Sequence, residues 1–266
     1  PTPPSQIQRA DLFAFLEEEL KDLESKLAEP RTNEWGRPDK AAAWALLSRM
    51  YLNGKVYTGQ DYNTEAITYS KKIIDEGYSL ENKYEWLMLG DNYLNTNEFI
   101  FTINYENRNI TWCGTNFLAL GPAGVPASIN GMSGSWKAFR FRQQIPELFP
   151  TYDTSVDKRA MFWTQGQSLE VESIQTSTDG FSAYKYRNLT REGNPIDQDN
   201  TYGNISDIDF PIFRLAEIYL IYAEAVLRGG QGGDIATALN YINHIRGRAY
   251  EDNPSSAEGN ISSSEF

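Results

Sequence analysis

Residues 209–250 have the sequence DFPIFRLAEIYLIYAEAVLRGGQGGDIATALNYINHIRGRAY, and this segment predicts two helices joined by a tight turn. A helix over 213–227 collects an apolar face, made of Ile218, Tyr219, Ile221, Tyr222, Ala225 and Val226. The glycines of 229–233 form the turn, and Asp234 is placed to cap a second helix over about 235–248. The segment is therefore expected to be a helix hairpin.

The N-terminal quarter of the chain has the same kind of pattern. A helix over 6–29, ended by Pro30, has apolar residues at three- and four-residue steps: Leu12, Phe15, Leu16, Leu20, Leu23 and Leu27. Asp39 is expected to cap a helix over 40–53 that stops at Asn53-Gly54, and Gly77 to end a helix over 62–76. The two hairpins share a small residue and a tyrosine in the first helix, a pattern that resembles tetratricopeptide repeats.

Residues 78–210 differ from both ends because Gly, Asn, Thr, Ser and Pro are frequent and apolar runs are short. FIFTINYEN (99–107) alternates like a strand, and 136–149 is expected to form a short helix. The predicted fold class is mostly α, with tetratricopeptide-like helix hairpins and a large loop-rich insertion that carries short strands. All 266 residues are expected to be part of one domain, with N-terminal helices over 6–77, the insertion over 78–210 and the second hairpin over 211–250.

Composition limits the function. The 24 Lys and Arg against 36 Asp and Glu give a net charge of −12, which argues against nucleic acid as a ligand. A single cysteine, Cys113, excludes an intrachain disulfide, and a single histidine, His244, leaves little basis for histidine-centred catalysis or metal binding. Aromatic residues make up 13% of the chain, which favours binding through ring faces.

Two tryptophans in the insertion are the best candidates for such binding. Trp112 lies in NRNITWCGTNF and Trp136 in NGMSGSWKAF, and both are surrounded by small and polar residues. Indole faces match the apolar faces of pyranose rings, and the neighbouring Asn107, Arg108 and Asn109 offer partners for hydroxyl groups. Local core packing is the alternative for both tryptophans.

Three aspartates suggest a structural calcium ion. Asp207 and Asp209 alternate in NISDIDFPIF, before the second hairpin, and Asp91 lies in LGDNY after the first. Calcium gathers carboxylate oxygens with loose geometry, and an ion here would tie the two ends of the insertion together. The alternative is that Asp207 and Asp209 cap a helix that begins near Pro211.

Four segments together resemble the SusD/RagB family: 35–53 (WGRPDKAAAWALLSRMYLN), 62–80 (YNTEAITYSKKIIDEGYSL), 209–230 and 238–250. They occur in the family's order, and each alone would be a generic helix. The middle of the chain is similar to the family's starch-binding members, where an aromatic residue and a Gly-Thr/Ser-Phe-Leu stretch precede a Gly-x-Trp-x-x-Phe-Arg segment. Here TWCGTNFLAL (111–120) and GSWKAFRFRQQIPELF (134–149) occupy those places.

The resemblance implies a non-catalytic cell-surface protein that captures starch or maltooligosaccharides and delivers them to a SusC-like TonB-dependent transporter. It also implies an outward-facing position on the outer membrane, with a lipid anchor in a segment absent from this chain. Family members are longer, and part of their glycan site lies in an N-terminal region that is missing here. Two alternatives stay open: a tetratricopeptide-like scaffold for proteins, and a glycoside hydrolase that uses a pair of carboxylates.

Overall fold

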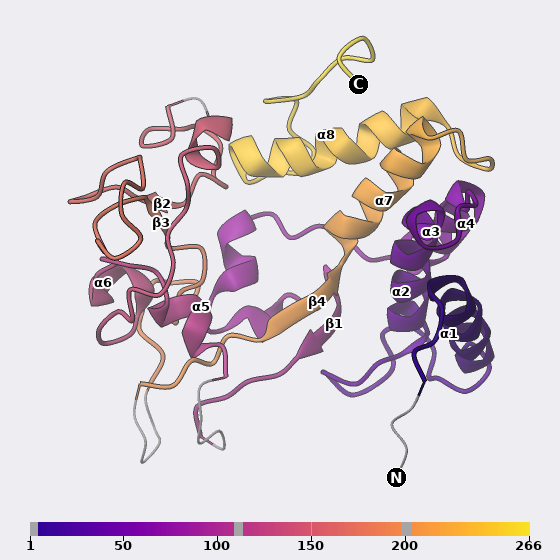
Figure 1. The fold of residues 1–266 in the computed structure, drawn as a ribbon, viewed down its shortest axis with the longest axis horizontal. Helices are drawn as coiled ribbons and strands as arrows, with labels where there is room; N and C mark the ends of the chain where they lie inside the picture. The colour runs from indigo at the N-terminus through magenta and orange to yellow at the C-terminus, as the bar shows by residue number, and fades with distance from the viewer. Residues whose placement is uncertain (1–4, 109–113, 150, 198–203) are drawn as a thin grey trace.

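A computed structural model describes residues 5–108, 114–149, 151–197 and 204–266, and Figure 1 shows a helical part beside a loop-rich part. The main helices are α1 (Arg9–Leu23), α2 (Lys40–Leu52), α4 (Asn63–Ile74), α7 (Leu215–Leu227) and α8 (Ile235–Glu251). Shorter ones are α3 (Gly54–Thr58), α5 (Asn116–Leu120), α6 (Ala127–Asn130) and the 3-10 turns η1 (Tyr84–Met88), η2 (Asn92–Leu94) and η3 (Pro146–Leu148). The predicted mostly-α fold class is confirmed.

Two small antiparallel sheets complete the structure. β1 (Phe99–Ile103) pairs with β4 (Phe210–Arg214), so the start and the end of the insertion lie side by side. β2 (Phe162–Trp163) pairs with β3 (Ser182–Ala183) inside the insertion. Because β4 runs directly into α7, the first sheet joins the loop-rich part to the helical part, as Figure 1 shows.

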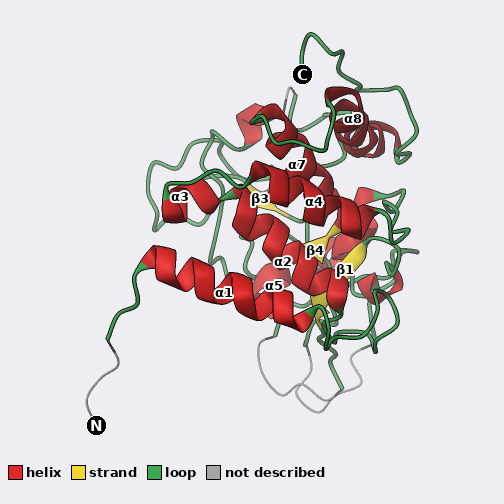
Figure 2. Cartoon of the chain, turned by 90° about the vertical axis from the view of Figure 1, so that its right-hand side faces the viewer, coloured by secondary structure: helices red, strands yellow, loops and turns green. Residues whose placement is uncertain are grey.

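The principal core lies between the helices. Figure 2 shows α1, α2, α4 and α7 side by side, and α7 also packs on α8. Small residues let the helix backbones approach closely, and larger apolar side chains fill the remaining space; fully buried members include Ala41, Ala45, Ala66, Leu47, Ile67, Ile73 and Ile218. Each fully buried aliphatic side chain contributes roughly 1.5–3 kcal/mol to folding.

The predicted caps and stops are largely confirmed. Asp39 accepts a hydrogen bond from Ala42 N, and Asp234 accepts one from Thr237 N. Gly77 follows α4 in the left-handed conformation, with φ of 77°. The stop at Asn53-Gly54 is confirmed, since α2 ends at Leu52 with Asn53 as its C-cap. A separate short helix that was not predicted, α3, begins at Gly54 and ends at Thr58, before Gly59 with φ of 81°.

The first helix is shorter than predicted and turned differently. α1 ends at Leu23, and its buried residues are Phe13 and Leu20. Leu12, Phe15 and Leu16, which the spacing places inside, are exposed. Two acids also face the core here: Glu17 of α1 accepts from the Tyr51 hydroxyl at 2.7 Å, and Glu24, just after α1, accepts from the Tyr69 hydroxyl at 2.8 Å. On this side of the chain, glutamates that accept from buried tyrosine hydroxyls face the core where leucines were expected.

Two local predictions in and after the insertion are also wrong. Residues 136–145 form no helix, and only Pro146–Leu148 make a single 3-10 turn. The helix expected from 213 begins at Leu215, because Phe210–Arg214 extend as β4 against β1. Strand pairing outweighs the helical pattern here, and Pro211 is compatible with a strand at the edge of a two-stranded sheet.

The irregular insertion is held by buried asparagines, whose side chains replace strand partners for residues 204–209. Asn92 exchanges two hydrogen bonds of 2.9 Å with the backbone of Asp209. Asn188 accepts from Asp207 N at 2.9 Å, and Asn116 accepts from Ser206 N at 2.7 Å. Buried backbone groups need such partners, so these amides fix the path of the segment without regular secondary structure.

None of the helices in the described residues is both long enough and apolar enough to cross a membrane.

Candidate functional site

An exposed aromatic cluster lies beside α5, and we call it the Trp136 patch: Phe117, Trp136 and Phe139. The ring centroids of Phe117 and Trp136 are 6.4 Å apart, and those of Phe117 and Phe139 are 5.2 Å apart. Trp136 is 45% exposed and Phe117 51% exposed, although rings of this size usually bury most of their surface. The alternative of core packing therefore does not describe Trp136.

The backbone around the patch is fixed. Trp136 N donates to Leu120 O at 2.7 Å, which fastens the loop to the end of α5. The Ser135 hydroxyl donates to Pro122 O at 2.6 Å. Gly121 lets the Phe139 ring approach so closely that a Cβ atom at position 121 would lie 2.3 Å from it. Rings held in this way lose little conformational entropy when a ligand stacks on them.

The predicted glycan-binding residues do not all gather at this patch. Trp112 and Asn109 lie outside the described residues, so their pairing with Trp136 stays a prediction. Asn107 and Arg108 instead line a separate cavity of about 1150 Å³, which we call the Asp209 cavity. Trp136 is not one of its lining residues.

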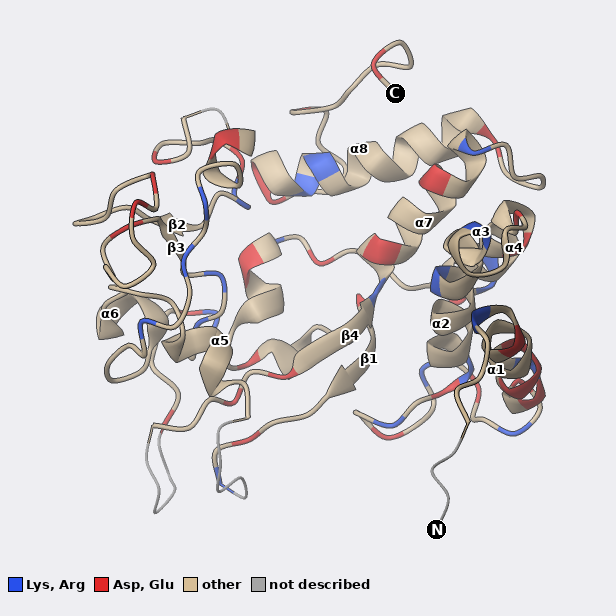
Figure 3. Cartoon of the chain, viewed as in Figure 1, with Lys and Arg blue, Asp and Glu red and all other residues tan. Residues whose placement is uncertain are grey.

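The Asp209 cavity lies between the segment after α4, the end of β1 and the segment before β4. Aromatic and apolar side chains line part of its wall: Trp35, Tyr93, Leu94, Tyr105, Pro195 and Ile196. Acidic groups recur along the segments that leave β1 and enter β4, as Figure 3 shows. The three aspartates predicted to hold calcium, Asp91, Asp207 and Asp209, all line this cavity.

Each of these aspartates accepts hydrogen bonds from N–H groups. Asp207 accepts from Asn107 N at 2.6 Å and from Asn107 Nδ2 at 2.7 Å. Asp209 accepts from Tyr105 N at 2.9 Å and from Trp35 Nε1 at 2.8 Å. The alternative that these residues cap a helix near Pro211 is wrong, since Pro211 lies in β4 and the carboxylates organise the loop after β1.

Burial raises the pKa of Asp91, Asp207 and Asp209 above that of a free carboxyl group, and the N–H donors offset this only in part. Asp91 accepts from Arg191 N at 2.8 Å through Oδ2. Its other oxygen, Oδ1, is buried and has no hydrogen-bond partner. In the described part of the chain, no three side chains of metal-binding types come together as a ready metal site. The calcium ion therefore stays a prediction.

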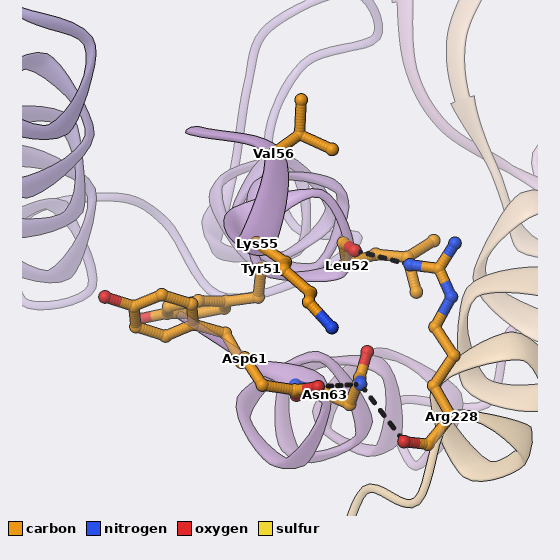
Figure 4. Close-up of a pocket in the computed structure, with 8 residues that line it drawn as sticks. Tyr51, Leu52, Lys55, Val56, Asp61, Asn63 and Arg228 are labelled. Atoms are coloured by element: carbon orange, nitrogen blue, oxygen red, sulfur yellow. Dashed lines mark hydrogen bonds between the residues drawn. The ribbon is translucent and has the colours of Figure 1, made fainter. Parts of the chain in front are cut away.

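A second, smaller cavity of about 420 Å³ lies among the helices, between α2, α3, α4 and the end of α7. Figure 4 shows the Lys55 side chain reaching across it toward Asn63. Arg228 closes one side and donates from Nη1 to Leu52 O at 2.9 Å, while Asp61 is engaged by Asn63. Its polar groups largely satisfy one another, which fits a seam between helices better than a ligand site.

Two functional candidates were missed at the sequence level, Trp35 and Phe117. Trp35 is followed by Gly36 in a polar loop, which is the signal that identified Trp112 and Trp136, so the same rule should have included it. Phe117 lies within TWCGTNFLAL, but an apolar residue on a short helix is normally assigned to the core. Only the structure shows that its ring is exposed.

Comparisons with known proteins agree with this fold. The model of the SusD family matches residues 25–266. The starch-binding protein SusD of Bacteroides thetaiotaomicron is 31% identical over an alignment of 293 residues, which covers 92% of this chain and 52% of that protein.

Solved structures give the same fold. A SusD superfamily protein from Parabacteroides distasonis superimposes with a TM-score of 0.66 at 22% identity, covering 94% of this chain and 51% of that one. The surface glycan-binding protein A of Bacteroides thetaiotaomicron, solved with laminarihexaose, gives 0.62 at 20% identity, covering 93% and 55%. The chain thus spans about half the length of these relatives. With the helix hairpins, the asparagine-held insertion and a family match over most of its length, this chain belongs to the SusD family.

Proposed function

We propose that this chain binds a glycan without chemically changing it, and that the Trp136 patch stacks on the sugar rings. The observation that carries the proposal is the exposure of Trp136 and Phe117 on a fixed backbone. A contiguous exposed aromatic patch is typical of a site that a ligand or partner covers. A relative named as starch-binding and a neighbour solved with laminarihexaose support the same class of ligand.

The proposed ligand is an α-glucan, such as starch or maltooligosaccharides. The support is the named starch-binding relative and the match of Trp136 to the family's Gly-x-Trp-x-x-Phe-Arg segment. Laminarihexaose is a glucose oligomer of different linkage, and it is the first competitor to compare. The full function would be capture at the outer face of the outer membrane, followed by transfer to a SusC-like TonB-dependent transporter.

Isothermal titration calorimetry with maltoheptaose and laminarihexaose tests the proposal. Trp136→Ala should weaken binding by about 1–3 kcal/mol, roughly fivefold to 150-fold, because one stacked ring is lost. Trp136→Phe should retain part of the affinity. Tyr57→Ala is the matched control, because Tyr57 is an exposed aromatic residue on α3, in the helical part.

Two outcomes would reject the proposal. Equal glycan affinities of the parent and Trp136→Ala would show that the Trp136 patch is not part of the glycan site. Release of new reducing ends during incubation with these oligosaccharides would instead support the glycoside hydrolase alternative.

A further inference from the structure

The loop that carries Trp136 has a backbone shape that one of its own residues disfavours. Gly134 lies two residues before the tryptophan and Lys137 directly after it, and both are left-handed, with φ of 88° and 55°. Glycine adopts this conformation freely, whereas for lysine it costs free energy. Such strain persists where surrounding contacts hold the backbone, and it is frequent at ligand sites. The loop therefore depends on other segments to keep Trp136 in place.

One of these segments reaches the loop through Asn204, which is 71 residues away from Ser133 in the sequence. Ser133 N donates to Asn204 Oδ1 at 2.8 Å, and Asn204 Nδ2 donates to Ser133 O at 2.8 Å. We call these two bonds the Asn204 clamp. Because one amide binds both backbone groups of Ser133, the clamp fixes the orientation of the loop as well as its position. Asn204 itself has φ of 51°, which asparagine tolerates better than most residues.

The segment that bears Asn204 is anchored in turn to α5. Asn116 Nδ2 donates to Asn204 O at 3.0 Å, and Ser206 N donates to Asn116 Oδ1 at 2.7 Å. Asn116 is buried and directly precedes the exposed Phe117. The same short segment therefore supports Phe117 through α5 and Trp136 through the clamp.

We propose that Asn204 is a positioning residue for glycan binding, which holds the indole of Trp136 beside Phe117 in the orientation that the sugar meets. The proposal rests on the proposed function, because it assumes that the Trp136 patch binds the glycan. The two ring centroids are 6.4 Å apart, so both rings can contact one bound glycan. Without the clamp the strained loop relaxes, and the glycan has to order Trp136 when it binds. The loss then appears as weaker binding by a folded chain.

Asn204→Gly tests the clamp in titrations with maltoheptaose and laminarihexaose. Glycine keeps the left-handed backbone at position 204 and removes only the amide. The affinity for the glycan that the parent binds should fall roughly twofold to tenfold, which is the cost of ordering one large side chain. Asn204→Asp retains the acceptor for Ser133 N and loses the donor to Ser133 O, so its affinity should lie between the two. This variant keeps the test decisive if Asn204→Gly does not fold.

Asn243→Ala is the matched control, because Asn243 forms the same pair of bonds elsewhere in the molecule. Its Nδ2 donates to Ile261 O at 3.0 Å, and its Oδ1 accepts from Ile261 N at 2.9 Å. Asn243 lies in α8, whereas the Trp136 patch lies beside α5. Loss of this amide should lower the melting temperature and leave the glycan affinity unchanged.

A double-mutant cycle shows whether Asn204 acts through Trp136. In the Trp136→Ala background there is no indole to position, so adding Asn204→Gly should change the remaining affinity by less than about twofold. A role of Asn204 in the fold alone would give the same fold-loss with and without the indole.

The outcomes separate the clamp from the proposed function. If Trp136→Ala weakens binding while Asn204→Gly binds as the parent does, the positioning role is wrong and the proposed function stands. An equal loss in both backgrounds, or a similar loss for Asn243→Ala, would also overturn the positioning role. If the parent binds neither glycan, the proposed function itself is rejected, and the positioning role with it.

Discussion

His244 is the single histidine of the chain, and burial in α8 lowers its pKa. Above pH 7 the imidazole is neutral in the folded and the unfolded chain, so it does not affect stability. As the pH falls through about 6.5, the unfolded chain takes up a proton that the folded chain refuses. The free energy of unfolding should therefore decrease from pH 7 downward and level off below the folded pKa.

Urea unfolding of the parent and His244→Gln between pH 8 and pH 5 measures this effect. The difference in unfolding free energy between the two proteins should change with pH only below about 7. Buried aspartates such as Asp39 and Asp209 have raised pKa values, and their effect has the opposite sign, since ionisation costs stability as the pH rises. These aspartates are present in both proteins, so their contributions cancel in the difference between the two unfolding free energies. A constant difference across the range would contradict the assignment to His244.

Calcium at Asp91, Asp207 and Asp209 is a second prediction at the scale of residues. An ion present at 100 times its dissociation constant stabilises the folded chain by about 2.7 kcal/mol, which corresponds to roughly 5–10 °C in melting temperature. EDTA should lower the melting temperature of the parent by that amount and leave Asp207→Asn unaffected. An unchanged melting temperature, together with no calcium found by elemental analysis, would show that the calcium prediction is wrong.

At the scale of residues, the sequence predicted which tryptophans are exposed better than it predicted which residues lie beside them in space. A tryptophan beside glycine in a polar loop is exposed at Trp136 and partly exposed at Trp35, as local composition predicts. Composition does not say which loops meet. Asn107 and Arg108 lie close in sequence to Trp112, yet they line a cavity that does not include Trp136, because pairing with Asp207 directs Asn107 there.

At the scale of elements, the two capping aspartates offer a direct comparison. Asp39 accepts from Ala42 N at 3.1 Å and also from Arg31 N at 2.7 Å, outside the helix, whereas Asp234 accepts from Thr237 N within α8. Loss of an N-cap costs about 0.5–2 kcal/mol. Asp39→Ala should fall at the upper end, because it also frees the turn at Arg31, and Asp234→Ala should cost less.

Chemical denaturation of the two variants in parallel gives the comparison, with Asp39→Asn as a conservative third variant. Asn retains a side-chain oxygen that can accept from Ala42 N, so it should recover part of the loss. Equal costs for the two alanine variants would show that the Arg31 contact adds nothing to the cap.

The elements that the sequence predicted well are α2, α4, α7 and α8, which all bury small residues. Capping aspartates mark the starts of α2 and α8. The prediction of the buried face of α1 was partly wrong, because leucine spacing does not show that Glu17 and Glu24 bind tyrosine hydroxyls. The helix prediction for residues 136–145 was wrong because their backbone bonds to the end of α5 and to Phe181, which are distant in the sequence. Patterns within one element cannot report such contacts.

At the scale of the whole molecule, hydrogen bonds from side-chain amides hold the insertion together more than secondary structure does. Asn92, Asn116 and Asn188 all bond to the backbone of residues 204–209. Frequent asparagine in the sequence predicted loops, but it gave no indication that the amides join segments about 20 to 120 residues apart. The overall arrangement of helices around a loop-rich part could thus be predicted, and the internal path of the insertion could not.

One buried ion network connects the parts of the molecule. Glu98, just before β1, is fully buried and accepts from Arg214 Nη1 at 3.0 Å, at the end of β4. It also pairs with Arg248 of α8 and accepts from Glu81 N at 2.8 Å. A single carboxylate therefore joins the first sheet, the last helix and the start of the insertion. Breaking a buried pair leaves an uncompensated charge, which costs about 3–5 kcal/mol.

Glu98→Gln should therefore destabilise the chain by about 3–5 kcal/mol, a large part of the roughly 5–15 kcal/mol that stabilises a typical domain. Glu34→Gln is the matched control, because Glu34 pairs with Arg37 on the surface, where an ion pair contributes about 1 kcal/mol at most. Since the network spans both parts, circular dichroism of the helices and fluorescence of the tryptophans should report the loss at the same denaturant concentration. Similar costs for the two glutamine variants would show that packing and the asparagine contacts, without the Glu98 network, hold the two parts together.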